Sequence, residues 1–433
     1  MILACAPAAA AAEAASGYVV KVESGSVYID FGDKTGAAVG QSFSVYTEGM
    51  ELKHPVSGQS LGKIETAVAV GRVTQVLPLY SVGSLRQDAG KVQSGMRAKL
   101  GAKPAPAAVA APTDGVPARK PRWKSAGFDY AIAGMALADF RGEGKTTLAL
   151  ADKKTVVLYA YPPEDPQPLA QFVPPGIGPR ILSLSAGDLN GNGRAELFVT
   201  LHNETLARAE TVVLEWTDGQ WRQLADIPWL VRQFQDGSGE TVLGMQQLLE
   251  DQTFPFSSIY RLSYRDGKYA PTEPIRFKHV NFLYDFTQAA LPGAKEPALL
   301  YETATDHVQV QFKGGFWKTP ETYGQTPSRL RWHSRLLEFH PQMPVLYEGG
   351  KAAVYLIKNT SALGALADPF GLFTGGQIER HAWDGAALAP QWRADLDGYC
   401  SAAQPVPSAL KAVDLAVAVT GTAGRSAVWI FDP

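Results

Sequence analysis

Apolar and polar residues alternate along most of this chain, which is the pattern of a β-strand with one buried face. In the first hundred residues the alternation predicts strands over 18–22, 26–31 and 41–46, separated by Gly and Asp turn signals. The later part of the chain also shows period two rather than the 3.6-residue stripe of an α-solenoid. An all-β fold is therefore expected.

Composition divides the chain into four parts. Residues 1–16 are rich in alanine and read as a signal segment, and residues 17–100 predict a small β-barrel-like domain. Residues 101–122 contain five prolines and seven alanines, which cannot build a core and predict an extended linker. Residues 123–433 are repetitive and predict a β-propeller.

The repeat length indicates the blades. Asp218 to Asp266, Asp266 to Gly314 and Asp384 to Asp432 each span 48 residues, and each of these residues follows an aromatic or apolar strand. A unit of this size with about four short strands matches one propeller blade, and about six units can be counted. The last unit lacks a fourth strand, and residues 122–125 are expected to supply it and close the ring.

One step of the repeat is longer than the others. Gly314 to Asp384 spans 70 residues, which implies an insertion of roughly 20 residues relative to the blade length. The segment SALGALADPFGLFTGG, residues 361–376, is the expected insertion. Its low charge makes it a candidate partner-facing loop.

The first block resembles the C-terminal domain of the flagellar assembly protein T family. The resemblance rests on VVKVESGSVYIDFGDKTGAAVGQSFSVYTEG from Val19, and on HPVSGQSLGKIETAVAVGRVTQV from His54. It covers about 80 residues and implies a small closed sheet used in envelope assemblies. It does not establish a flagellar role.

The sharpest local motif is DLNGNGRAE, residues 188–196. Oxygen side chains at its positions 1, 3, 5 and 9, with glycines that permit a tight loop, suit Ca²⁺. The motif resembles the calcium loop of FG-GAP/VCBS repeats, the blade type of the integrin α-subunit propeller. The metal residues that this resemblance implies are Asp188, Asn190, Asn192, Arg194 and Glu196.

Two interpretations of this loop stay open. Two asparagines replace the aspartates usual in the family, so one modest calcium site or a metal-free turn would both suit the sequence. The equivalent loops in other blades lack some of these oxygen side chains. In the loop from Asp139, Arg141 or Lys145 is expected to pair with Asp139 or Glu143 in place of an ion. Asp285 stands in a loop without supporting oxygens.

Charge and the N-terminal residues bear on location. The net charge of −2, without any Lys/Arg run, argues against a nucleic-acid binder. Residues 1–16 predict export, and Ile2-Leu3-Ala4-Cys5 resembles a lipobox, so Cys5 is either lipidated or removed with the signal. No later segment has 18 uninterrupted apolar residues. A periplasmic or outer-membrane-associated protein is expected, with membrane association only through a lipidated Cys5.

Catalytic signals are weak. The seven histidines have no metal-binding spacing, there is no G-x-S-x-G elbow, and Cys400 has no histidine close in sequence, so it is expected to be buried or inert. Most tryptophans fall at repeated strand ends and are expected to pack between blades. Trp317 and Tyr323 are the best candidates for exposed aromatic contacts.

The sequence therefore favours a non-enzymatic binding or assembly protein of the bacterial cell envelope, with unidentified envelope proteins as partners. A periplasmic propeller enzyme and a carbohydrate or small-ligand binder are the alternatives. A cluster of buried carboxylates at the channel mouth would favour the enzyme.

Overall fold

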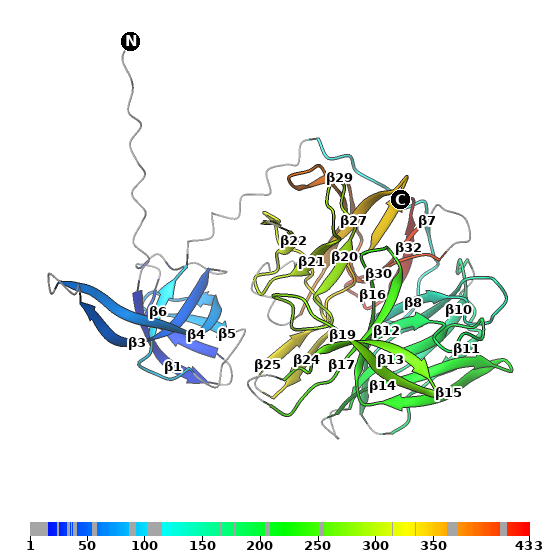
Figure 1. Ribbon diagram of the computed structural model, residues 1–433, viewed down its shortest axis with the longest axis horizontal. Helices are drawn as coiled ribbons and strands as arrows, with labels where there is room; N and C mark the ends of the chain where they lie inside the picture. The colour runs from blue at the N-terminus through cyan, green and yellow to red at the C-terminus, as the bar shows by residue number, and fades with distance from the viewer. Residues whose placement is uncertain are drawn as a thin grey trace, which may run out of the picture. The chain divides into compact units, whose positions relative to one another are not determined.

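The computed structural model is all-β in the part that it describes (Figure 1). That part comprises residues 16–23, 26–32, 35, 37, 41–53, 59–85, 92–101, 115–164, 166–176, 178–203, 208–251, 255–313, 315–333, 335–361, 371–407 and 414–433. Within it, no helix is long and apolar enough to span a membrane. The chain forms two compact units.

The first unit contains a closed six-stranded barrel with the strand order β1-β2-β5-β4-β3-β6, because β6 also pairs with β1. Its core consists of inward side chains such as Val27, Phe43 and Ala98, which are almost fully buried. The strands are β1 (Ser16–Glu23), β2 (Ser26–Ile29), β3 (Ser42–Lys53), β4 (Ser60–Val76), β5 (Ser81–Leu85) and β6 (Arg97–Leu100). Residues 1–15 of the expected signal segment, Cys5 among them, lie outside the described residues, as do residues 102–114 of the expected linker, whereas Ser16 already begins β1.

The second unit contains six four-stranded antiparallel sheets, so the prediction of an all-β chain with a propeller of about six blades is confirmed. We number the blades 1 to 6 along the chain. Blade 1 is β8 (Gly134–Ala138), β9 (Thr147–Ala151), β10 (Val156–Ala160) and β11 (Ala170–Phe172). Blade 2 is β12 (Pro179–Gly187), β13 (Glu196–Asn203), β14 (Arg208–Thr217) and β15 (Gln220–Ile227). Blade 3 is β16 (Leu230–Gln235), β17 (Thr241–Gln246), β18 (Ile259–Arg265) and β19 (Lys268–Ile275).

The remaining blades follow the same order, with one extra hairpin. Blade 4 is β20 (Phe286–Ala289), β21 (Ala298–Glu302), β22 (Val308–Phe312) and β23 (Gly315–Lys318). The hairpin is β24 (Arg329–Trp332) and β25 (Arg335–Glu338). Blade 5 is β26 (Val345–Glu348), β27 (Lys351–Thr360), β28 (Gly375–Trp383) and β29 (Leu388–Leu396), and blade 6 is β30 (Tyr399–Pro405), β31 (Leu415–Thr420), β32 (Ser426–Phe431) and β7 (Trp123–Lys124).

The ring closes as the sequence predicted. β7 pairs with β32, with Trp123 opposite Ile430 and Lys124 opposite Trp429. The Lys124 ammonium lies 3.4 Å from the centre of the Trp429 ring, a cation–π contact. The last blade is thus built from both ends of the propeller sequence and leaves no open edge at that strand.

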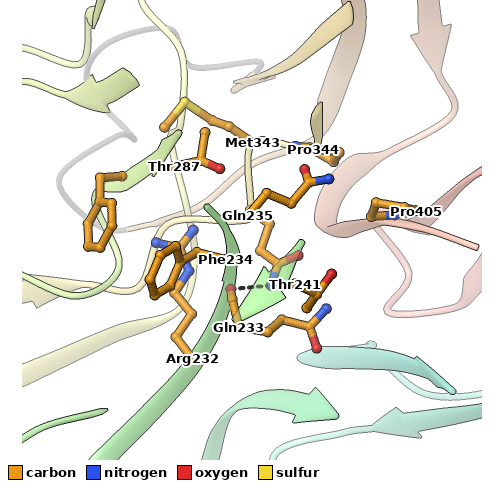
Figure 2. A pocket seen from close by; sticks show the side chains of 11 residues that line it. Arg232, Gln233, Phe234, Gln235, Thr241, Thr287, Met343, Pro344 and Pro405 are labelled. Atoms are coloured by element: carbon orange, nitrogen blue, oxygen red, sulfur yellow. Dashed lines mark hydrogen bonds between the residues drawn. The ribbon is translucent and has the colours of Figure 1, made fainter. Parts of the chain in front are cut away.

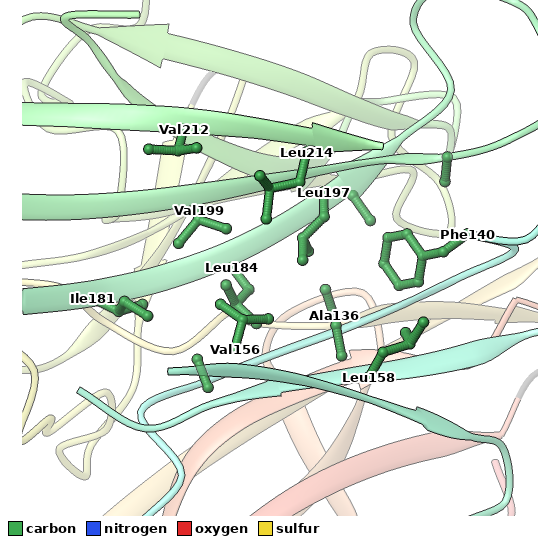
Figure 3. Close-up of a cluster of buried hydrophobic side chains, with 14 of the residues drawn as sticks. Ala136, Phe140, Val156, Leu158, Ile181, Leu184, Leu197, Val199, Val212 and Leu214 are labelled. Atoms are coloured by element: carbon green, nitrogen blue, oxygen red, sulfur yellow. The ribbon is translucent and has the colours of Figure 1, made fainter. Parts of the chain in front are cut away.

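The core of the propeller lies between the blades. The cluster in Figure 3 joins Val156 and Leu158 of blade 1 to Leu184, Leu197 and Val199 of blade 2. Second strands such as β13 are buried along their whole length, because a neighbouring blade covers each face. Outer strands such as β15 are exposed or partly exposed over most of their length, and in β15 only Ile227 is buried. This difference explains why the sequence shows both continuous apolar runs and period-two runs.

The turns that set the repeat are confirmed. Asp218 and Gly219 have φ of 52° and 79°, and Asp266 and Gly267 have 51° and 74°. Two successive residues with positive φ make the tight hairpin turn whose twist matches the flanking strands, and Asp-Gly adopts it readily. These turns join the third and fourth strands of blades 2 and 3.

The extra length between Gly314 and Asp384 has a different main source from the one expected. Residues 319–344, which contain the β24–β25 hairpin, connect β23 to β26. Residues 361–374 connect β27 to β28, and 362–370 of this segment lie outside the described residues. The sequence gives no repeat signal for the hairpin, because its strands belong to no blade.

Candidate functional site

A pocket lies at the axis of the propeller, where the first strands of several blades meet (Figure 2). Blade 3 supplies β16 and the start of β17, blade 4 the start of β20, and blade 6 the end of β30. Residues 342–344, just before β26, supply a further wall. The lining residues are Arg232, Gln233, Phe234, Gln235, Thr241, Phe286, Thr287, Gln342, Met343, Pro344 and Pro405.

The pocket has a buried floor and an open rim. Arg232 and Thr287 are each 3% exposed and lie at the floor, whereas Thr241 is exposed and Gln235 and Gln342 are partly exposed. Inside its open mouth, the pocket has room for about one water molecule.

Strand alternation aims the side chains of β16 in two directions. Arg232 and Phe234 turn toward blade 4: the Arg232 guanidinium donates to the carbonyl oxygen of Leu283 at 3.0 Å, and the Phe234 ring centre lies 4.9 Å from that of Phe286. Gln233 turns the other way, and its Oε1 accepts from the amide N–H of Ala186 in blade 2 at 2.8 Å. A single strand thus joins three blades at the site.

Two segments, residues 319–331 and 337–344, flank the β24–β25 hairpin, and we call them the legs of the insert. The Ser328 hydroxyl donates to the Leu182 carbonyl of blade 2 at 3.1 Å. Gln342 donates to the Gln233 carbonyl of blade 3 at 2.7 Å, the bond drawn in Figure 2. The legs thus contact the first strands of blades 2 and 3, which are not their neighbours in sequence.

Ionisable side chains anchor the second leg. His340 Nδ1 lies 2.5 Å from Glu302 Oε2 and 2.7 Å from the Gly324 carbonyl oxygen, and His340 Nε2 lies 3.7 Å from Asp285 Oδ1. Burial disfavours a charge on His340, but the carboxylates of Glu302 and Asp285 outweigh it and raise the His340 pKa to about 10. Burial raises the pKa of Asp285 to about 7, although 27% of its side chain remains exposed. These groups therefore form an ion network that holds the insert.

The first leg has a similar anchor. The Tyr323 hydroxyl donates to Glu379 Oε2 at 2.8 Å, and His381 Nε2 lies 2.9 Å from the same oxygen. Tyr323 is only 4% exposed, so the expectation that it is an exposed aromatic is wrong. Trp317 is half-buried and packs 6.4 Å from Trp383, while the exposed aromatic of β23 is Phe316 at 63%.

The sequence did not single out these anchors. Asp285, Glu302 and His340 are far apart in sequence, and none carries a local motif. Their only common signal is position, since Asp285 directly precedes β20 and Glu302 ends β21. In an antiparallel pair, the start of the first strand lies beside the end of the second. This rule could have placed Asp285 next to Glu302, but it says nothing of His340.

The loop of the expected calcium site is closed by hydrogen bonds. Asp188 Oδ1 accepts from the amide N–H groups of Gly191 at 2.8 Å and Asn192 at 3.2 Å, and its Oδ2 accepts from Gly193 at 2.9 Å. The Asn192 side-chain oxygen accepts from the Arg194 amide at 2.9 Å. These Asx-type bonds fold the backbone into its tight turn.

Glu196 is fully buried beneath this loop. Its carboxylate accepts from the amides of Leu189 at 2.7 Å and Asn190 at 3.1 Å, and from the Tyr269 hydroxyl of blade 3 at 2.8 Å. Burial raises the Glu196 pKa, and these hydrogen bonds oppose the rise. Glu196 therefore joins the loop to the neighbouring blade.

The donor set of the loop does not fit a calcium ion as it stands. The side-chain amides of Asn190 and Asn192 present N–H groups, not oxygens, to Glu215 Oε2, at 2.9 and 2.6 Å. Hard cations require converging oxygens. Among the described residues, no three His, Cys, Asp or Glu side chains gather closely enough to hold a metal ion. Calcium binding by Asp188, Asn190, Asn192, Arg194 and Glu196 stays a prediction that only a binding measurement decides.

Two smaller expectations are met. In the loop from Asp139 in blade 1, Arg141 forms a salt bridge with Glu143 at 2.7 Å, as the sequence predicted. Cys400 is buried with a free thiol, and burial raises its pKa, which makes it a poor nucleophile.

Comparisons with known proteins identify no family. No family model and no curated protein sequence matches the chain. The solved structure of U3-55K is 10% identical over 72% of this chain and 99% of that chain, with a TM-score of 0.40. BBS1N in complex with ARL6DN is 10% identical over 69% of this chain and 78% of that chain, with a TM-score of 0.35. A mutant of the Aleuria aurantia lectin in complex with alpha-methyl-L-fucoside is 9% identical over 70% of this chain and 93% of that chain, with a TM-score of 0.34. At these similarities none of the three bears on the function of this chain.

Proposed function

We propose that this protein is a non-enzymatic binding or assembly protein of the bacterial cell envelope, with the propeller as its interaction scaffold. The observation that carries the proposal is the ring of six blades joined by buried hydrogen bonds. A rigid ring can present loops from six blades at fixed positions, which is how scaffold proteins build binding surfaces.

Buried side chains join the blades by hydrogen-bonding to the backbone of the next blade. Asn359 of blade 5 donates to the Cys400 carbonyl of blade 6 and accepts from the Cys400 amide, both at 2.8 Å. Gln404 of blade 6 donates to the Met135 carbonyl of blade 1 at 2.7 Å. Such bonds fix the angle between blades, because a buried amide without its partner costs about 1–3 kcal/mol.

The barrel supplies a second surface. Its strands β3 and β4 form a long hairpin, and Met50 on this hairpin is 81% exposed. Glu48 pairs with Lys63 at 2.8 Å across the two strands, which supports the hairpin. Two binding modules on one chain raise each other's effective concentration at a shared target.

The test is an affinity pull-down of the full chain from bacterial envelope extracts. One variant replaces residues 362–370 with a Gly-Ser segment of equal length. The matched control replaces residues 204–207, the corresponding connection between second and third strands in blade 2. We expect a defined set of envelope proteins with the full chain and the control, and loss of part of that set with the first variant. Absence of any envelope protein from all three would overturn the proposal.

A further inference from the structure

The hairpin of β3 and β4 in the barrel has a strand edge without a neighbour. β4 is 17 residues long, but β5 pairs with it only over residues 71–76, and β6 pairs with β3 only over residues 43–46. The rest of the hairpin is a ribbon of two strands that extends beyond the barrel (Figure 1). Among the described residues, no strand pairs with residues 60–70 of β4 on the side away from β3.

This edge is suited to receive another strand. The backbone N–H and C=O groups of an unpaired edge can pair with a further chain, and proteins usually shorten, bend or cover such edges. Here β4 continues without a bulge from Gly62 to Ala67, because the extra residues of the ribbon at this point belong to β3. Lys63, Glu65, Thr66 and Ala67 are all exposed. A ribbon of two exposed strands is marginally stable by itself, so a third strand would stabilise it.

The charges on the ribbon indicate which strand fits. Glu48 of β3 and Glu65 of β4 lie directly opposite each other, and like charges in this arrangement repel. Lys63 offsets the repulsion by pairing with Glu48 at 2.8 Å, and Lys99 of β6 does so by pairing with Glu65 at 2.5 Å. Lys63 and Glu65 are two residues apart and therefore lie on the same face of β4. The open edge thus carries one positive and one negative charge side by side.

This pair of charges is complementary to itself. When two copies of β4 pair antiparallel about a two-fold axis at residue 64, residues equally far from the axis lie opposite each other. Lys63 of each copy then lies opposite Glu65 of the other, with Cβ atoms about 4.5–5.5 Å apart. An axis at residue 63 or 65 would instead place lysine opposite lysine or glutamate opposite glutamate. Charge complementarity therefore favours a single register.

We propose that two copies of this chain associate by antiparallel pairing of their β4 edges, centred on Ile64, which joins the two barrels through one continuous sheet. A contact of a few residues from each copy is smaller than the about 1,200–2,000 Å² that stable interfaces bury. The dimer is therefore weak and depends on protein concentration. This inference goes beyond the proposed scaffold role, because it requires no envelope protein.

The first test is the mass of the purified full chain, measured by light scattering and sedimentation from about 1 μM to 1 mM, the range of weak association. We expect an equilibrium between monomers and dimers. Lys63→Glu and Glu65→Lys each place like charges opposite one another and should weaken dimerisation at least about tenfold. In an equimolar mixture of these two variants, glutamate again lies opposite lysine at both positions, so dimers should return.

A third variant controls for the change of charge itself. Lys53→Glu lies on the same ribbon but outside the pairing segment, and the Lys53 side chain is as exposed as that of Lys63, at 65% and 57%. It should change the dissociation constant less than about threefold. All of these positions are exposed, and each variant must melt within a few degrees of the parent protein before its mass is compared.

A cysteine at the axis tests the register. In a Cys5→Ser background, Ile64→Cys places the two new thiols opposite each other, within the range of a disulfide, so mild oxidation should cross-link chains in pairs. Thr66→Cys is the matched control, because the two copies of residue 66 would lie about 13 Å apart along the strands. Cys400 is buried and should not contribute.

Four results would overturn the proposal. They are monomers at every concentration, no dimers in the mixture of Lys63→Glu and Glu65→Lys, equal cross-linking through residues 64 and 66, and an envelope protein on the ribbon of a chain that stays monomeric. The pull-down with replaced residues 362–370 tests a different part of the chain. Failure of the dimer and failure of the scaffold proposal can therefore be told apart.

Discussion

Gln246 offers a direct measurement of what holds two blades together. It ends β17 of blade 3 and is 1% exposed. Its Nε2 donates to the carbonyl oxygens of Ser257 at 3.0 Å and Asn281 at 2.8 Å, and its Oε1 accepts from the Leu283 amide at 2.9 Å. Asn281 and Leu283 lie in the segment that leads into blade 4, so the Gln246 side chain joins blades 3 and 4.

The replacement Gln246→Leu keeps the approximate volume and removes all three hydrogen bonds. Each bond contributes about 0.5–1.5 kcal/mol net, and the backbone groups left behind are buried. We therefore expect the free energy of unfolding to fall by about 3 kcal/mol, which lowers the melting temperature by about 5 °C or more for a domain of this size.

The neighbouring glutamine supplies the control. Gln247 is half-buried, and its side chain has no partner among the described residues. The same change there, Gln247→Leu, should cost less than about 0.5 kcal/mol. Urea unfolding followed by tryptophan fluorescence, together with calorimetry, measures both variants. A loss below about 1 kcal/mol for Gln246→Leu, or equal losses for the two variants, would refute the idea that this side chain holds the blades.

Three further predictions follow from the other features. Ser125→Pro removes the amide N–H that donates to the Val428 carbonyl oxygen at 2.9 Å. The free energy of unfolding in urea should fall by about 2–4 kcal/mol. An unchanged melting temperature would contradict this prediction. His340 has a pKa raised to about 10, so its stabilisation is complete below about pH 6.5 and is lost as the pH rises to about 10. The free energy of unfolding should therefore fall by about 1.4 kcal/mol per pH unit in this window, and a His340→Gln variant that kept the slope would contradict this. Millimolar Ca²⁺ should leave the melting temperature unchanged, because the side-chain amides of Asn190 and Asn192 present N–H groups to Glu215. A rise in the melting temperature with Ca²⁺ that the Asp188→Ala variant loses would instead establish the calcium site.

The parts of the fold that the sequence predicts are those governed by short-range patterns. Period-two strands, Asp-Gly turns and a constant blade length are local properties, and they predict about six blades and the completion of the last blade by residues 122–125. The Arg141–Glu143 pair was predictable for the same reason.

The axial site could not be predicted in this way. Arg232, Asp285 and His340 come together only because the ring brings blades 3 and 4 and the insert to one axis. The insert itself breaks the repeat, so its strands carry no periodic signal. Tyr323 shows the same limit: its loop-like sequence indicates exposure, but Glu379 of a neighbouring blade buries it.

The pairing of β7 with β32 has a consequence for the timing of synthesis. β7 is the first propeller strand to be synthesised and β32 is the last. β7 therefore cannot pair until nearly the whole propeller sequence has left the ribosome. Blades 1 to 5 can form their own sheets earlier, but their ring stays open until then. A ribosome stalled anywhere before residue 426 should carry a chain that proteases cut readily at residues 115–130, and release of the finished chain should protect that segment in a single step.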